Sequence, residues 1–238
     1  MRRPGKQERQ LLPQLRREAV DSKEHKLSKF NAHIHSHMKL FIDDSLPYIT
    51  TETLTATISS LPPWRQEQAM RFKHEQGRKE CALSYLLLCR ALREEYGIYE
   101  QPRFDIGKHG KPSLIFTDTP IAKEIHFNMS HCKTAVACAV ADWPVGVDIE
   151  RTGRLKERLA RHVLNEEEYH DVITSPAPNL RFTAYWTMKE ALVKLTGQGL
   201  HGDIRQLLEN AESIIFDTHT NKEKGYAVTV AYSALHEY

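Results

Sequence analysis

Long apolar runs are scarce in this sequence of 238 residues. The longest, residues 83–89 and 134–141, fall far short of the roughly 20 apolar residues that cross a bilayer. No apolar segment typical of a secretory signal follows the basic start. We therefore expect a cytoplasmic protein with no membrane partner.

Cysteine is also scarce. The four cysteines lack C-x-x-C spacing, so we expect reduced, mostly buried thiols rather than a disulfide framework. The hydrophobic fraction of 40% and the charged fraction of 27% are typical of globular proteins. The chain is long enough for one large domain or two small ones with a real core.

Net charge is only +2, but it is unevenly distributed. Residues 1–37 hold nine Lys or Arg and four Asp or Glu. Phe30 is their one Phe, Tyr or Trp, so they lack a pattern of interleaved aromatic residues, and they contain no recognisable nucleic-acid motif. We therefore expect a flexible basic extension over residues 1–37 that binds no nucleic acid.

Local patterns predict strands and helices after residue 37. Residues 38–58, rich in threonine and apolar residues, predict strands, and the pair Pro62-Pro63 begins a helix. Apolar spacing predicts a helix over residues 79–96, with Gly97 as its cap. The second half predicts strands at residues 134–140 and 145–150, helices at residues 155–172 and 180–196, and a closing strand pair at residues 214–216 and 226–232.

This order predicts an α+β fold of two small subdomains, although no sequence repeat relates them. We place an N-terminal subdomain at residues 38–143 and a C-terminal subdomain at residues 144–238.

The segment Val145-Gly-Val-Asp-Ile-Glu150 alternates strictly. In a strand, Asp148 and Glu150 share one face with their Cα atoms about 7 Å apart, so both carboxylates can converge on one cation. Mg²⁺ prefers such oxygen ligands. An exposed strand face that ends in a turn is the alternative, and this motif alone leaves both open.

The segment Trp186-Thr-Met-Lys-Glu-Ala-Leu-Val-Lys194 predicts a helix on which Trp186, Glu190 and Lys194 lie along one edge. Lys189 lies one step round. Glu190 is a candidate third metal ligand, with both lysines directed at phosphates. Taken alone, the helix favours an ordinary surface Glu–Lys pair beside a buried Trp.

Two further segments carry polar groups suited to phosphates. Phe127-Asn-Met-Ser-His131 places the hydroxyl of Ser130 beside the imidazole of His131, without the G-x-S-x-G elbow of a hydrolase. Gly110-Lys-Pro112 lies in a glycine-containing loop, but Lys111 is followed by proline, so it is no Walker A loop.

In this order, the four segments resemble the surfactin-synthetase-activating type of 4'-phosphopantetheinyl transferase. That family's pattern is Gly-Lys-Pro, Phe-Asn-x-Ser-His, Gly-(Ile/Val)-Asp-x-Glu, then (Trp/Phe)-x-x-Lys-Glu-Ala-x-x-Lys. The last continues here as Gly197-Gln-Gly-Leu200, like the family's Gly-x-Gly-Leu. The resemblance spans about residues 60–200 and the closing strands, but not residues 1–37.

The resemblance implies two similar α/β subdomains related by a pseudo-twofold axis, with the active site in the cleft between them. It implies an enzyme of the holo-[acyl-carrier-protein] synthase type, with Mg²⁺, or Mn²⁺ in its place, as cofactor. Such an enzyme moves the 4'-phosphopantetheine of coenzyme A onto a serine of an apo acyl- or peptidyl-carrier protein and releases 3',5'-adenosine bisphosphate. The resemblance also implies a monomer.

Individual roles follow from the same resemblance. Mg²⁺ would be held by Asp148, Glu150 and Glu190, and Glu190 or a water that it orients would take the serine proton. The phosphates would be bound by Lys189, Lys194, Ser130 and His131, with Lys111 near the nucleotide end. The 3'-phosphate side would be faced by Arg65, Arg71 and Arg78, although their spacing departs from the family's. Glu168 is expected as a further acid of the active site, with a solvated helix face as the alternative.

Residues 151–161 are basic, and in the family this segment lies near the carrier protein. The basic residues are Arg151, Arg154, Lys156, Arg158 and Arg161. A solvated helix is the alternative. Two other functions stay open: a different Mg²⁺-dependent phosphotransferase, and a non-catalytic module that binds coenzyme A or carrier proteins.

Overall fold

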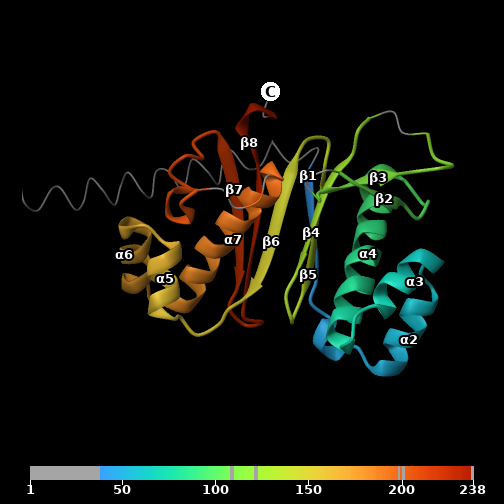
Figure 1. The fold of residues 1–238 in the computed structure, drawn as a ribbon, viewed down its shortest axis with the longest axis horizontal. Coiled ribbons are helices and arrows are strands. Elements are labelled where there is room, and N and C mark those ends of the chain that lie inside the picture. The colour runs from blue at the N-terminus through green and yellow to red at the C-terminus, as the bar shows by residue number, and fades with distance from the viewer. Residues whose placement is uncertain (1–37, 108–109, 121–122, 198, 200–201, 237–238) are drawn as a thin grey trace, which may run out of the picture. The chain divides into compact units, whose positions relative to one another are not determined.

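A computed structural model describes residues 38–107, 110–120, 123–197, 199 and 202–236 (Figure 1). The predicted basic extension, residues 1–37, lies outside the described residues, as do Gln198 and Leu200 of the glycine-containing motif. Among the described helices, none is long and apolar enough to cross a membrane.

The elements confirm the predicted α+β class. In chain order they are β1 (Met38–Asp43), η1 (Leu46–Tyr48), α2 (Thr51–Ser59), α3 (Pro63–Met70), α4 (Glu75–Tyr96), β2 (Arg103–Ile106), β3 (Pro112–Ile115), β4 (His126–His131), β5 (Val136–Ala141), β6 (Val145–Arg151), α5 (Glu157–Val163), α6 (Glu166–Thr174), α7 (Pro178–Thr196), η2 (Ile204–Gln206), β7 (Ile214–Asn221), β8 (Tyr226–Ser233) and η3 (Ala234–His236).

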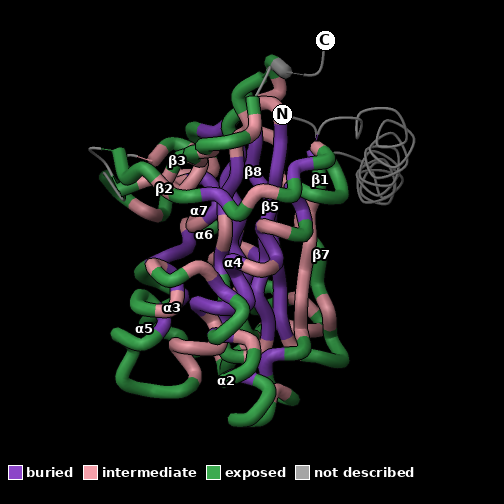
Figure 2. Tube along the Cα trace, turned by 90° about the vertical axis from the view of Figure 1, so that its right-hand side faces the viewer, coloured by how far each residue is buried: buried purple, intermediate pink, exposed green. Residues whose placement is uncertain are grey.

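Two antiparallel three-stranded sheets, with strand orders β1-β5-β4 and β6-β8-β7, form the centre of the described fold. Alanines and valines on their facing sides share one buried cluster, so the sheets pack face to face. The other side of the first sheet packs on α4, which in turn packs on α2 and α3, and α7 covers the other side of the second sheet. Figure 1 shows α4 and α7 on opposite sides of the strands, and Figure 2 shows β5 and β8 buried.

The strand β6 has the alternation that its sequence predicted. The side chains of Val145, Val147 and Ile149 are fully buried between the sheets. Gly146 faces α7, and a Cβ atom built on it would overlap the carbonyl oxygen of Ala191. The backbone of α7 therefore lies directly against the strand that carries Asp148.

The predicted strand over residues 38–58 is wrong after Asp43, because residues 51–59 form α2. Thr50 caps this helix by accepting the Thr53 N–H, which is a local hydrogen bond that threonine side chains favour at helix starts. Leu54 and Ile58, four residues apart, are its buried positions. The helical spacing of these two residues outweighs the strand propensity of the threonines.

The predicted helix over residues 155–172 is two helices. α5 ends at Val163 and α6 begins at Glu166, because Asn165 and Glu168 form a reciprocal capping box at the start of α6. The two strands predicted at residues 134–140 and 145–150 are confirmed as β5 and β6, and they belong to different sheets. β4 was not predicted as a strand.

Replacing Gly146 by alanine is expected to lower the free energy of unfolding by about 1–3 kcal/mol, the usual cost of overpacking. The added methyl group would lie 2.5 Å from Leu195 N, so it could fit only if α7 moved. Urea unfolding would measure the loss. The matched control is Gly153→Ala, where no atom lies within 4 Å of the new methyl. Equal stability of the two variants would show that the contact is not tight.

Candidate active site

Side chains from β4, β6 and α7 meet in a closed triangle of hydrogen bonds. The ammonium of Lys194 donates to Asp148 Oδ1 at 2.6 Å and to Ser130 Oγ at 2.9 Å. Ser130 Oγ in turn donates to Asp148 Oδ1 at 2.8 Å. The structure thus brings together three of the residues that the sequence nominated, from segments that lie far apart in the chain.

Asn128 positions β4 for this triangle. Its buried side-chain oxygen accepts the Val147 N–H at 2.9 Å, which ties β4 to β6. Ser130 lies two residues further along β4, and alternate residues of a strand share a face. The amide contact therefore directs the hydroxyl of Ser130 to Asp148. The sequence motif contained Asn128, but sequence reasoning gave it no role.

Asp148 is the most deeply enclosed acid of the three predicted metal ligands, with 3% of its surface exposed. Its Oδ1 atom accepts from Ser130 and Lys194, whereas its buried Oδ2 atom has no hydrogen-bond partner among the described residues. A buried carboxylate oxygen without a partner is costly. Asp148 Oδ2 is therefore available to a cation.

Glu150 and Glu190 belong to the same charged cluster as Asp148. Burial raises the pKa of Glu150, and the negative charge of Asp148 raises it further, while Lys194 opposes both. Burial and then the charge of Asp148 raise the pKa of Glu190 as well. The negative charge of Asp148 thus disfavours the ionised forms of Glu150 and Glu190, and a divalent cation would relieve this repulsion.

The three acids do not form a closed metal shell. Within the described part of the chain, no three His, Cys, Asp or Glu side chains are grouped closely enough to hold a metal ion. Two observations therefore support Mg²⁺ at these acids. Their carboxylates are the oxygen ligands that Mg²⁺ prefers, and Asp148 Oδ2 has no hydrogen-bond partner among the described residues.

Lys189 does not join this cluster. Its side chain is 1% exposed, and its ammonium lies 2.9 Å from Glu168 Oε2. Glu168 is buried as well, at the first turn of α6. The structure therefore places these two residues, predicted as a phosphate ligand and an active-site acid, in contact with each other and out of solvent.

Lys111 ties its loop to the candidate site through backbone contacts. Its ammonium donates to the carbonyl oxygens of Leu195 at 3.2 Å and of Val145 at 3.3 Å. Burial lowers the pKa of Lys111. The side chain thus fixes the start of β3 against the end of α7 and the start of β6.

The predicted 3'-phosphate residues separate into two groups. Arg65 is buried in the core, where it donates to the Cys81 carbonyl oxygen at 2.7 Å and lies 5.2 Å from the centre of the Tyr85 ring. Arg71 is exposed at the end of α3, and Arg78 donates to the Phe72 carbonyl oxygen from the first turns of α4. Only the second group is accessible to a ligand.

His131 lies beside the start of α4. Its Nδ1 atom is 3.4 Å from Glu80 Oε2 on α4. Gln76 of α4 also donates to the carbonyl oxygen of Lys133 at 3.3 Å. The start of α4 therefore lies against the turn after β4, which brings His131 toward the part of α4 that carries Arg78.

Two models of known protein families match the two halves of the described chain. A family model described as 4'-phosphopantetheinyl transferase, N-terminal, matches residues 49–142, and one described as the 4'-phosphopantetheinyl transferase superfamily matches residues 144–233. The chain belongs to the 4'-phosphopantetheinyl transferase superfamily. The two matches meet where the chain passes from β5 to β6, and so from one sheet to the other.

Individual relatives in this superfamily are similar over most of the chain. 4'-Phosphopantetheinyl transferase psf-1 of Bacillus pumilus is 31% identical over 170 residues, or 68% of this chain and 70% of the relative. 4'-Phosphopantetheinyl transferase Sfp of Bacillus subtilis is 29% identical over 146 residues, or 60% and 63%. L-aminoadipate-semialdehyde dehydrogenase-phosphopantetheinyl transferase of Saccharomyces cerevisiae is 29% identical over 164 residues, or 64% and 58%. The chain therefore spans 58% to 70% of the length of these relatives.

A cavity of about 300 Å³ opens beside Glu150 in this member of the superfamily. Its apolar wall is formed by Leu159, Phe182 and Trp186, and its basic rim by Arg151, Arg154 and Lys156. Sequence reasoning missed Phe182. Its signal was present, because Phe182 precedes Trp186 by four residues on the helix edge that leads to Glu190 and Lys194.

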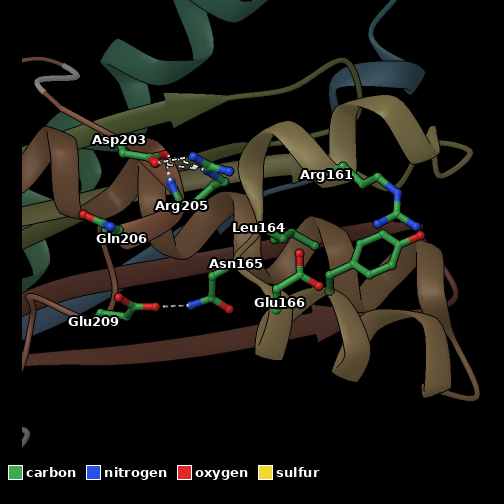
Figure 3. A pocket seen from close by; sticks show the side chains of 9 residues that line it. Arg161, Leu164, Asn165, Glu166, Asp203, Arg205, Gln206 and Glu209 are labelled. Carbon is green, nitrogen blue, oxygen red and sulfur yellow. Dashed lines mark hydrogen bonds and ion pairs between the residues drawn. The ribbon is translucent and has the colours of Figure 1, made fainter.

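A second cavity of about 340 Å³ lies between α5, α6 and η2 (Figure 3). Two pairs of its lining side chains bind each other. Arg205 is paired with Asp203 at 2.6 Å, and Asn165 donates to Glu209 at 2.7 Å. Four of the polar side chains that line this cavity are therefore engaged with one another.

Proposed function

We propose that this chain transfers the 4'-phosphopantetheine of coenzyme A to a serine of an apo acyl- or peptidyl-carrier protein and releases 3',5'-adenosine bisphosphate. The observation that carries the proposal is the contact of Ser130, Asp148 and Lys194 beside an unpartnered carboxylate oxygen. A hydroxyl, an ammonium and a cation-binding acid at one point suit a pyrophosphate. Membership of the superfamily and a chain that contains both matched halves support a monomeric enzyme.

Asp148, Glu150 and Glu190 are the residues that would hold Mg²⁺, or Mn²⁺ in its place. When bound, the ion would neutralise charge on the pyrophosphate. Its binding would also give Asp148 Oδ2 the partner that it lacks among the described residues. The positive charge would oppose the effects of burial and of the Asp148 charge, which raise the pKa of Glu150 and of Glu190.

The remaining groups bind and orient the substrate. Lys194 and Ser130 would donate to the pyrophosphate oxygens, with His131 and the accessible arginines Arg71 and Arg78 on the side of the 3'-phosphate. Charge develops on the leaving phosphate as its bond to the β-phosphorus breaks. Donors that are already in place stabilise that charge without reorganisation.

In the proposed step, the carrier serine oxygen bonds to the β-phosphorus of coenzyme A, and 3',5'-adenosine bisphosphate leaves with the bridging oxygen. The serine proton must be removed. We assign this task to a water oriented by Glu190, because a carboxylate engaged with Mg²⁺ is itself a weak base.

Intact-mass spectrometry tests the function directly. An apo carrier protein incubated with this protein, coenzyme A and Mg²⁺ is expected to gain one phosphopantetheine, and EDTA is expected to prevent the gain. No gain on several carriers, with coenzyme A still bound, would favour a non-catalytic binding module. Transfer of another phosphoryl group would favour a different phosphotransferase.

Asp148→Asn and Glu190→Gln are expected to lower the transfer rate by about a hundredfold or more, the scale on which fixed electrostatic groups act. Each change removes a negative charge from the proposed cation site with little change of shape. Transfer rates at saturating coenzyme A and Mg²⁺ would measure the loss, with circular dichroism as a check on folding. Glu167→Gln, an exposed acid on α6, is the control and should retain the wild-type rate. Wild-type rates in both site variants would remove the metal assignment.

The basic rim of the cavity beside Glu150 suits an acidic carrier protein. Arg154 and Lys156 line this cavity and precede α5. Arg161, also in the basic segment, is already paired with Glu157 at 3.1 Å. We therefore assign the carrier contact chiefly to the part of the segment nearest Glu150, where a carrier serine would be close to the proposed metal ligands.

The double charge reversal Arg154→Glu, Lys156→Glu is expected to lower kcat/KM for the carrier by about tenfold or more, while KM for coenzyme A stays unchanged. The wild-type rate should fall as salt increases, and the rate of the variant should depend less on salt, because the attraction has been removed. Lys222→Glu, on the turn between β7 and β8, is the control. If Lys222→Glu and the double variant behave alike, the carrier docks elsewhere.

A further inference from the structure

The ammonium of Lys189 is fully satisfied by groups of the protein itself. It lies 2.9 Å from Glu168 Oε2 and donates to the carbonyl oxygens of Ile204 at 2.9 Å and of Arg205 at 3.2 Å. A lysine ammonium carries three protons. Three acceptors therefore use all of them, and no proton is left for a phosphate oxygen.

The side chain and the backbone N–H of Glu168 also have hydrogen-bond partners within the protein. Its Oε2 atom accepts the backbone N–H of Asn165 at 3.1 Å, and its own N–H donates to Asn165 Oδ1 at 2.8 Å. The carboxylate thus closes the first turn of α6 and binds Lys189 at the same time. The pair joins α7 to α6, and through the two carbonyl oxygens it joins α7 to η2.

Lys189 and Glu190 are consecutive on α7, so their side chains leave the helix about 100° apart. Lys189 is directed into α6 and η2, whereas Lys194, one turn beyond Glu190 on the same helix edge, donates to Asp148 Oδ1 at 2.6 Å. Rotation of α7 about its axis would therefore move both side chains together. The buried ion pair resists that rotation, because either charge left alone in the interior would be strongly unfavourable.

Other contacts hold α7 on the sheet from its opposite side. Thr187 Oγ1 lies 2.8 Å from Thr229 Oγ1 of β8, and Gly146 meets the helix backbone. On the side of α6, Arg181 and Tyr185 of α7 also donate to Asp171 Oδ2, so the Lys189–Glu168 pair braces the helix together with these contacts. Together they set the direction in which Glu190 and Lys194 approach Asp148.

We propose that Lys189 and Glu168 are positioning residues, which fix the rotation of α7 so that Glu190 and Lys194 face Asp148, and that neither touches the substrate. This inference rests on the proposed transferase function. It assigns Lys189 a role different from that of a phosphate ligand, and Glu168 a role different from that of an active-site acid.

The test compares Lys189→Met, Glu168→Gln and the double variant. Each single change leaves a buried charge unpaired and is expected to lower kcat for transfer by about tenfold or more through displaced site groups. The double variant removes both charges, and a glutamine at position 168 can still accept the Asn165 N–H. It is expected to recover to within about threefold of the wild-type kcat, because well-matched neutral pairs often replace buried ion pairs without loss.

Calorimetry with coenzyme A and Mg²⁺ supplies a second readout that needs no carrier protein. The proposal expects the affinity of the double variant for coenzyme A to stay within about threefold of the wild-type value, since no ligand contact is lost. The matched control is Asp44→Asn with Lys224→Met, which removes an exposed Lys–carboxylate pair joined at 2.6 Å and should change neither kcat nor affinity.

A double variant as impaired as Lys189→Met, with coenzyme A bound about tenfold more weakly, would overturn the proposal and make Lys189 a ligand of the phosphates. If a single variant does not fold, the folded double variant decides between these outcomes. A wild-type protein that binds coenzyme A but modifies no carrier would refute the transferase function, while the calorimetric comparison would still test the role of Lys189.

Discussion

The site depends on the direct contact between the backbones of β6 and α7 at Gly146. A side chain at this position would separate the helix from the strand, because its first carbon would already overlap the Ala191 carbonyl oxygen. Because glycine keeps the helix and the strand in contact, the short side chain of Asp148 reaches Lys194 at 2.6 Å. Gly146 thus lets α7 pack so closely on β6 that Lys194, on the charged edge of the helix, contacts Asp148 on the strand.

A second constraint comes from the facing sides of the two sheets. Ala137, Ala139 and Ala141 of β5 are fully buried there, and such small side chains let the sheets approach closely. Asn128 then links β4 to β6 with a buried hydrogen bond, which is favourable because the amide oxygen replaces water at the Val147 N–H. The hydroxyl of Ser130 reaches Asp148 as a consequence of both contacts.

Sequence reasoning succeeded where the position of a residue follows from local periodicity. The alternation of β6 predicted the shared face of Asp148 and Glu150, and helical spacing predicted the edge with Glu190 and Lys194. It did not predict the contacts that a side chain makes with residues far away in the sequence. Spacing on α7 showed that Lys189 diverges from Glu190, but Glu168 lies 21 positions away in the sequence, and no periodic pattern connects the two. The buried position of Arg65 has the same origin, since two of its aromatic neighbours, Tyr85 and Phe104, come from other elements.

The lysines Lys111, Lys189 and Lys194 carry the same charge but differ in whether their ammonium groups could bind a ligand. Lys111 and Lys189 donate to backbone carbonyl oxygens that cannot turn away, so a phosphate would have to break structural contacts to recruit them. Lys194 is 29% exposed, and its partners are a hydroxyl and a carboxylate of the site itself. A cation at Asp148 would weaken the hold of that carboxylate on Lys194, and the hydroxyl can rotate. Under the proposed function, the ammonium of Lys194 would then be free to follow the charge that the cation attracts, which would make the metal and the phosphate ligand parts of one coupled site.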